Sequence, residues 1–209
     1  MKVLLFRLLL IFVPAASFAQ TAEPHIAKGS VITYDIKENG SVYKLTIKVN
    51  AFSEKDGVVL QWATTETPKR SGTSTMDYGS LTQADQLDLQ LVTGKEVLEK
   101  GTVRFFAGLN MKEDMSTSHL GEFKIDGTAH SFLSIATTAQ STEVLFNGKK
   151  STVDFVYGED TDPDNSNIGL VNIGDDVYLM NEFSSKKITI NLVSITSPAA
   201  KNQSRILHP

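Results

Sequence analysis

The chain has 209 residues, 41% of them hydrophobic, with 20 basic and 24 acidic side chains and no cysteine. This mild negative balance argues against a nucleic-acid-binding surface, which usually carries a stripe of Lys and Arg. Without cysteine the chain has no disulfides, and a zinc site would have to be built from His and carboxylate ligands alone. We therefore expect a fold that is held by its hydrophobic core and has no nucleic-acid partner.

Residues 1–19 have the pattern of a secretory signal peptide. Lys2 places positive charge at the start, an apolar run interrupted only by Arg7 follows, and Ser17-Phe18-Ala19 has the small-x-small pattern of a cleavage site. The apolar run is shorter than the about 20 residues that a membrane-spanning helix needs. We expect cleavage before Gln20 and an exported protein, periplasmic or secreted, with no transmembrane segment in the mature chain. The alternative is an uncleaved membrane anchor at the N-terminus.

The remaining chain is expected to form one domain. Residues 20–29 are polar and are predicted to be a loose leader, and residues 198–209 show no period and are predicted to be a C-terminal tail. Between them, over residues 30–197, no linker and no repeat divides the chain. A single β-rich domain over 30–197 is the simplest interpretation.

Two hairpins are the clearest local predictions. Apolar and polar side chains alternate over residues 32–36 and 43–49, on either side of Asn39-Gly40. The same pattern surrounds Asn147-Gly148, over residues 144–157. Alternation around Asn-Gly is the strongest short-range signal of a β-hairpin with a type I′ turn.

The other predicted elements are short. Further strands are expected over 58–66, 71–79, 102–108, 120–126, 176–183 and 186–196, and short helices at the start of 80–91 and over 109–118. We expect Ser80 to cap the first helix, Leu87, Leu89 and Leu91 to alternate like a strand, and Trp62 to lie in the core. Eight to ten strands of this kind predict a mainly β fold, either an antiparallel β-sandwich or an open half-barrel, with one or two short helices.

An acidic stretch between Tyr157 and Asp176 is the longest segment without a predicted element. Asp160, Asp162 and Asp164 match positions 1, 3 and 5 of a calcium loop, and Asn165 stands where such a loop has glycine. Position 12 is Val171, which offers no side-chain oxygen. Asp, Asn, Pro, Ser and Gly are also the residues of any exposed turn. We expect a solvated connecting loop, and therefore no calcium-specific rise in melting temperature.

No catalytic constellation is recognisable. The four histidines, His25, His119, His130 and His208, are scattered, and His119 with Glu122 makes at most half of a metal site. The chain has no G-x-S-x-G elbow, no G-x-G-x-x-G and no Walker loop, which argues against nucleophilic hydrolysis and nucleotide binding. Two carboxylates for glycoside hydrolysis cannot be paired from sequence. We therefore predict no catalytic, cofactor-binding or metal-binding residue and no cofactor, and we favour a non-enzymatic protein.

One apolar stretch has two interpretations. It contains Phe105, Phe106, Leu109, Met111 and Met115. Methionine adapts to irregular shapes, so the stretch could form a flexible wall around an apolar ligand. The interpretation that we favour is ordinary hydrophobic core.

The signal peptide, the cysteine-free alternation and the stretch AKGSVITYDIKENGSVYKLTIKV (27–49) together resemble a known group. They look like the uncharacterised exported β-rich envelope proteins of Bacteroidota-type Gram-negative bacteria. The resemblance implies an antiparallel half-barrel or sandwich and brings no catalytic residue with it.

Three functional hypotheses follow, and the first is favoured. It is an exported non-enzymatic protein that binds a small apolar ligand or another envelope component. The second is a structural or interaction protein that docks a protein partner through a sheet edge or through the acidic loop. The third is a hydrolase of envelope polymers.

Overall fold

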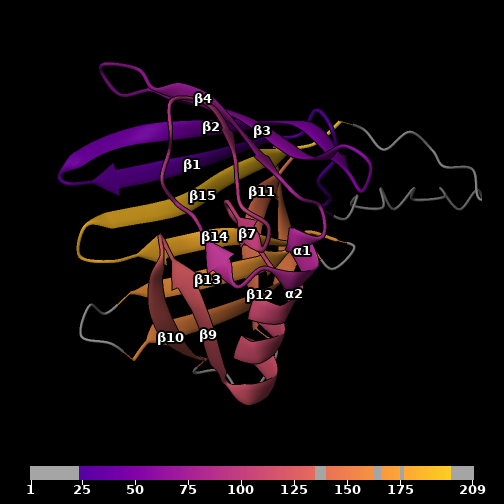
Figure 1. The fold of residues 1–209 in the computed structure, drawn as a ribbon, viewed down its shortest axis with the longest axis vertical. Coiled ribbons are helices and arrows are strands. Elements are labelled where there is room, and N and C mark those ends of the chain that lie inside the picture. Colours follow the sequence, from indigo (N-terminus) through magenta and orange to yellow (C-terminus); the bar gives the residue numbers. More distant parts are fainter. Residues whose placement is uncertain (1–23, 135–139, 162–165, 175–176, 199–209) are drawn as a thin grey trace, which may run out of the picture.

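The computed structural model describes residues 24–134, 140–161, 166–174 and 177–198. The fold is 60% strand and 8% helix, which confirms a mainly β protein with two short helices (Figure 1). Within the described ranges, no helix has the length and apolar character needed to cross a membrane.

Fifteen strands, many of them short, form one connected sheet in the described part of the chain. The strands are β1 (Val31–Glu38), β2 (Ser41–Ser53), β3 (Gly57–Thr64), β4 (Ser71–Met76), β5 (Gln86–Leu87), β6 (Gly94–Val97), β7 (Thr102–Val103), β8 (Phe106–Ala107), β9 (Leu120–Ile125), β10 (Thr128–Ser134), β11 (Gln140–Phe146), β12 (Lys149–Asp160), β13 (Asn167–Asn172), β14 (Tyr178–Ser184) and β15 (Ile188–Thr196). The helices are α1 (Ser80–Gln83) and α2 (Leu109–Glu113), and the π-helical turn η1 (Asp114–Ser118) continues α2.

Five of these strands close into a small barrel. Strands β11 to β15 pair in antiparallel order, and β11 returns to β15 through the parallel pair Phe146 and Ile195. Two wings extend from the barrel. One runs from β15 through β1, β2, β3 and β4 to β6, and the other runs from β12 through β10, β9 and β5 to β7. Figure 1 shows the first wing above the barrel strands and the β9–β10 hairpin below them.

Both predicted hairpins are confirmed. Asn39 and Gly40 join β1 to β2 with φ of 49° and 84°, and Asn147 and Gly148 join β11 to β12 with φ of 48° and 76°. Positive φ at both central residues is the requirement of a type I′ turn, which Asn and Gly meet at low steric cost. The Asn-Gly pairs therefore fix the register of both hairpins.

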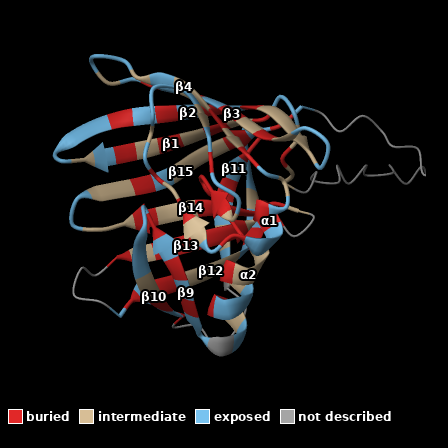
Figure 2. Ribbon diagram, in the orientation of Figure 1, coloured by how far each residue is buried: buried red, intermediate tan, exposed pale blue. Residues whose placement is uncertain are grey.

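The core follows the alternation of the strands. Buried residues form bands across β1, β2 and β3 (Figure 2). Over much of these strands every second residue is buried. Trp62 is buried, as predicted, and Phe105, Phe106, Met111 and Met115 are all 2% exposed or less. Leu109 is partly buried against the same cluster. The interpretation of this stretch as hydrophobic core is confirmed.

The expected connecting loop between Tyr157 and Asp176 was wrong over residues 158–160 and 167–172, which belong to strands. Strand β12 continues to Asp160, and β13 begins at Asn167, with Glu159 opposite Asn167 in the antiparallel ladder. An acidic or amide side chain is compatible with a strand when it lies on the solvent side, so composition alone misled the prediction.

Other boundaries also differ from the predictions. The N-cap of α1 is Gly79, and the Ser80 hydroxyl instead accepts a hydrogen bond from the Gly101 amide at 3.1 Å. The alternation of 80–91 yields only the two-residue β5. The strand expected over 102–108 is divided into β7 and β8 by Arg104 and Phe105. Strand β6 was not predicted, because its residues are mostly exposed and show no alternation.

The described part of the predicted leader lies against the fold. Ile26 is buried, the Gly29 amide donates to the Val49 carbonyl at 2.7 Å, and the Val49 amide donates to the Ser30 carbonyl at 2.9 Å. These contacts attach the start of the described chain to β2.

Candidate functional site: a cavity with an apolar floor and a charged rim

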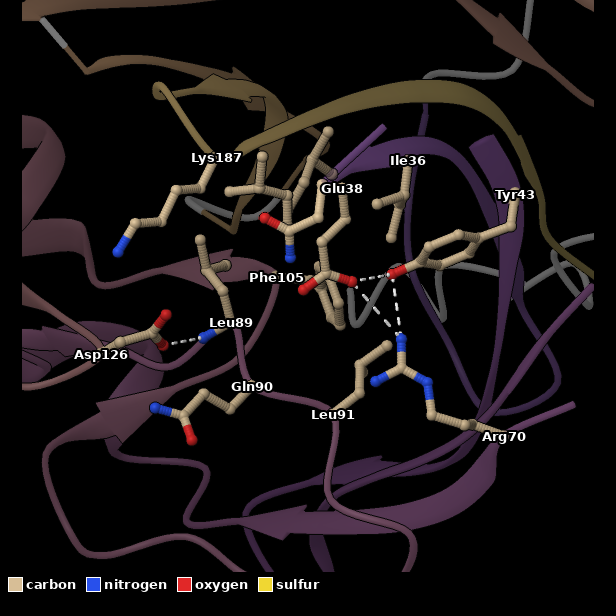
Figure 3. A pocket seen from close by; sticks show the side chains of 13 residues that line it. Ile36, Glu38, Tyr43, Arg70, Leu89, Gln90, Leu91, Phe105, Asp126 and Lys187 are labelled. Carbon is tan, nitrogen blue, oxygen red and sulfur yellow. Dashed lines mark hydrogen bonds and ion pairs between the residues drawn. The ribbon is translucent and has the colours of Figure 1, made fainter. Parts of the chain in front are cut away.

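A cavity of about 380 Å³ lies where the first wing meets the barrel. This volume is within the range of small-molecule sites, about 300–1,000 Å³. Its wall combines the β1–β2 hairpin, the start of β15, the β9–β10 turn and the loop of residues 88–91 (Figure 3). The lining residues are Ile36, Glu38, Asn39, Tyr43, Arg70, Leu89, Gln90, Leu91, Phe105, Asp126, Lys187, Ile188 and Ile190.

The floor of the cavity is apolar. Ile36, Phe105 and Ile190 are each exposed by 2% or less, and Leu89 is also buried. Ile36 and Ile190 are partners in the β1–β15 ladder, so their side chains lie on the same, inward side of the sheet. This floor offers hydrophobic contact and no polar group of its own.

Phe105 has an unusual backbone. Its φ is 62°, in the left-handed region that a bulky side chain rarely adopts. The Phe105 carbonyl accepts a hydrogen bond from the Met180 amide at 2.8 Å, and its ring stacks on Tyr34 at 5.2 Å between centroids. The Tyr34 hydroxyl donates to the Met180 carbonyl at 2.8 Å, and burial raises the Tyr34 pKa. These contacts hold the Phe105 ring in the cavity floor against a local backbone cost.

A hydrogen-bonded cluster forms one side of the rim. The Tyr43 hydroxyl donates to Glu38 Oε2 at 2.8 Å and accepts from an Arg70 terminal nitrogen at 3.1 Å (Figure 3). The same nitrogen lies 3.5 Å from Glu38, and Arg70 Nε pairs with Glu66. The guanidinium also lies over the Tyr43 ring, 5.8 Å from its centroid. We refer to Glu38, Tyr43, Glu66 and Arg70 as the rim cluster.

The contacts within the rim cluster shift the pKa values of Glu66, Arg70 and Tyr43. The hydrogen bond from Arg70 lowers the pKa of Glu66, and the hydrogen bond to Glu66 raises the pKa of Arg70. Burial, and then the Glu38 carboxylate, raise the pKa of Tyr43 far above its usual value. At neutral pH the phenol is therefore protonated, and it donates to Glu38.

Asp126 and Lys187 approach the cavity from the other side. Asp126 lies in the β9–β10 turn, and its Oδ1 accepts a hydrogen bond from the Leu89 amide at 2.7 Å. Desolvation, followed by the nearby carboxylate of Asp88, raises the pKa of Asp126. Lys187 lies in the turn before β15, and Figure 3 shows its side chain well apart from Tyr43 and Arg70. Among the described residues, Lys187 makes no ion pair.

A second arginine holds the loop that carries Leu89 and Leu91. Arg104 has no exposed side-chain surface and pairs with Asp88 and Glu96, each at 2.5 Å. It also donates to the Ser74 hydroxyl at 2.5 Å. This buried cluster, Ser74, Asp88, Glu96 and Arg104, ties the cavity loop to β4 and β6.

The histidines discussed above do not form a site. His119 ends η1 with φ of 59°, and Glu122 lies on β9. His130 Nδ1 lies 2.5 Å from Asp160 Oδ2, and His25 lies near Ser197 and Phe146. In the part of the chain that the structure describes, no group of three or more His, Cys, Asp and Glu side chains could hold a metal ion. His208 lies outside that part.

The acidic stretch is only partly described. Asp160 is buried beside His130 and its amide donates to the Ser166 carbonyl at 2.7 Å. Asp162, Asp164 and Asn165 lie outside the described residues. The expectation that this stretch does not bind calcium stays a prediction.

Sequence reasoning singled out no residue of the rim. The cavity is assembled from segments that are distant in the chain, so no local spacing marks it. The only available signal was the set of charged residues that adjoin turns, such as Glu38 and Lys187, and such residues are common at any surface. Phe105 was noticed in a stretch for which we favoured hydrophobic core, with the wall of an apolar ligand site as the alternative.

No protein-family model, no curated protein and no solved structure matches this chain. The site is therefore interpreted from its own geometry.

Proposed function

We propose that this chain is an exported, non-enzymatic protein that binds a small apolar ligand in the cavity above Phe105. The observation that carries the proposal is the Phe105 backbone, which is held at φ of 62° while its ring forms the apolar floor. Strained backbone of this kind is concentrated at functional sites. The signal-like residues 1–19 support export, so that the binding protein would act in the periplasm or outside the cell.

The cavity chemistry favours binding over hydrolysis. Its lining, as far as the chain is described, contains no serine, threonine, histidine or cysteine. A serine, threonine or cysteine nucleophile and a histidine base are therefore missing from the wall. Glu38 is engaged by Tyr43 and Arg70, which makes it part of the wall rather than a free base.

Docking of a protein partner through a sheet edge is less favoured. One edge of the sheet, β6, has only four residues, and its Glu96 turns inward to Arg104. Short edge strands that carry charge, such as Lys95 here, are typical of edges that avoid pairing with another chain. Val97, which is 80% exposed, is an isolated apolar residue on this edge.

Mass spectrometry of the exported protein tests the proposal. The protein is expressed with residues 1–19 and purified without detergent, and bound small molecules are extracted. We expect the intact mass of a chain that starts at Gln20. We also expect an apolar compound to co-purify with the protein. Leu91→Trp, which adds bulk at the cavity wall, should abolish its recovery. Leu145→Trp, on the exposed side of β11 and outside the cavity, is the matched control and should retain the compound.

The proposal is contradicted if Leu91→Trp and Leu145→Trp recover the same compound in equal amount, since the ligand would then lie elsewhere. A folded protein that yields no compound and takes up no apolar ligand in vitro would contradict it as well.

A further inference from the structure

The two cations of the cavity differ in how they are paired. Arg70 is bonded to Glu66, Tyr43 and Glu38, so a ligand could reach it only by displacing existing partners. Lys187 lines the same cavity and has no ion pair within the described residues. Its ammonium group offers three donors to a ligand.

The two carboxylates of the lining are already engaged. Glu38 accepts from Tyr43 and lies 3.5 Å from Arg70, and Asp126 accepts from the Leu89 amide. A cationic ligand would therefore compete with donors that are part of the wall. An anionic ligand atom would meet an available ammonium group at Lys187, and a charge-assisted hydrogen bond would form.

From these observations, and resting on the proposed function, we propose that the ligand is a medium-chain carboxylate, with its head group at Lys187 and its chain over Phe105. A single negative charge fits better than a phosphate dianion, because Glu38 and Asp126 line the same cavity and would repel the second charge. At about 30 Å³ for each water-sized group, the 380 Å³ cavity holds on the order of a dozen non-hydrogen atoms. Decanoate has this size.

The apolar chain of such a ligand would contact the apolar side chains of the cavity floor. Ile36 and Ile190 form adjacent parts of the floor, and Leu91 and Ile188 are partly buried beside them. A flexible chain laid along these side chains loses apolar surface to them, while the carboxylate stays near the rim where Lys187 is exposed. The apolar floor thus matches the chain of an amphipathic molecule, and Lys187 matches its charged head group.

Calorimetric titration with three probes of equal chain length tests the head group. The probes are decanoate and decyltrimethylammonium, each below the concentration at which it forms micelles, and decanol, below its solubility in water. We expect decanoate to bind about tenfold more tightly than decanol, the effect of one charge-assisted contact, and the cationic probe to bind most weakly. Lys187→Gln should remove the advantage of decanoate and leave decanol binding unchanged.

Lys186→Gln is the matched control, since it removes the same charge from the neighbouring residue, which does not line the cavity. It should leave all three affinities within about twofold. Equal binding of decanoate and decanol, or no effect of Lys187→Gln, would overturn the head-group assignment and leave the cavity as an apolar site. If none of the three probes binds the folded protein, the proposed function fails, and this inference with it.

Discussion

Two arginines of this protein each pair with two carboxylates, but one arginine is buried and the other is partly exposed. Arg104 has no exposed side-chain surface, and its partners Asp88 and Glu96 are 18% and 20% exposed. Arg70 is 35% exposed, and its partners Glu38 and Glu66 are 36% and 21% exposed. The first cluster joins strands inside the fold, whereas the second forms the wall of a cavity that opens to solvent.

The comparison shows that burial, and not residue type, decides what such a cluster does. A buried guanidinium must keep every partner, because removing one leaves a charge in a poorly solvated place. A half-exposed guanidinium is partly solvated by water, so its ion pairs contribute little to folding. The rim cluster therefore forms a cavity wall that contributes little to folding, whereas the Arg104 cluster holds the loop at residues 88–91 against β4 and β6.

The largest expected effect separates the two arginines directly. Arg104→Met removes the cation from between Asp88 and Glu96, and we expect the free energy of unfolding to fall by about 3–5 kcal/mol. Arg70→Met should lower it by less than about 1 kcal/mol, because its guanidinium is partly solvated by water. Urea denaturation of both variants measures the difference. Equal losses would show that the two clusters are equivalent, against this account.

The two tyrosines that adjoin the cavity provide a second, smaller contrast. Tyr34→Phe removes a buried hydroxyl from the Met180 carbonyl, and we expect a loss of about 1–3 kcal/mol, since the carbonyl loses a partner without access to water. Tyr43→Phe removes a hydroxyl at the rim, where water can replace it, and should cost about 0.5–1 kcal/mol. Thermal unfolding of the two variants gives the order. A larger loss for Tyr43→Phe would mean that the rim cluster is the structural one.

The smallest expected effect concerns pH. Folding raises the pKa of Asp126 above its usual 3.8, mainly through desolvation. Between the two pKa values the folded protein therefore binds more protons than the unfolded chain, so the contribution of Asp126 to stability is present at low pH and is lost as pH rises through the raised pKa. Asn at this position keeps an acceptor for the Leu89 amide and tolerates the positive φ of the turn.

We therefore expect the stability of Asp126→Asn, measured relative to the parent, to increase as pH rises from 3 to 7. Denaturation across this range measures the change, and Asp154→Asn, at an exposed position on β12, corrects for the altered net charge. A gain that is no larger than that of Asp154→Asn would show that the 88–91 loop does not desolvate Asp126.

Local patterns in the sequence were enough to predict the hairpins and the mainly β class. Asn39-Gly40 and Asn147-Gly148 determine turn type within a few residues, and alternation determines which side chains are buried. The closure of the barrel between Phe146 and Ile195 joins strands that are distant in the chain, so no local pattern indicates it. For the same reason the rim cluster could not be predicted, because Glu38 and Arg70 meet only after β1 to β4 have paired.

Composition misled the prediction where polar residues occupy strands. Asn167 and Glu159 belong to paired strands, although their neighbours have the composition of a turn. Phe105 is the opposite case, since its surroundings resemble an ordinary strand and its left-handed backbone becomes evident only in three dimensions.

The central claim, that the cavity above Phe105 binds an apolar chain, is tested most directly by locating a bound ligand. In isotope-filtered NMR spectra of the protein with labelled decanoate, the account predicts contacts from the chain protons to the methyl groups of Ile36 and Ile190. Val42, which is 75% exposed and does not line this cavity, should show none. Contacts to Val42 or to the exposed pair Leu120 and Leu133, without contacts to Ile36 and Ile190, would contradict the claim.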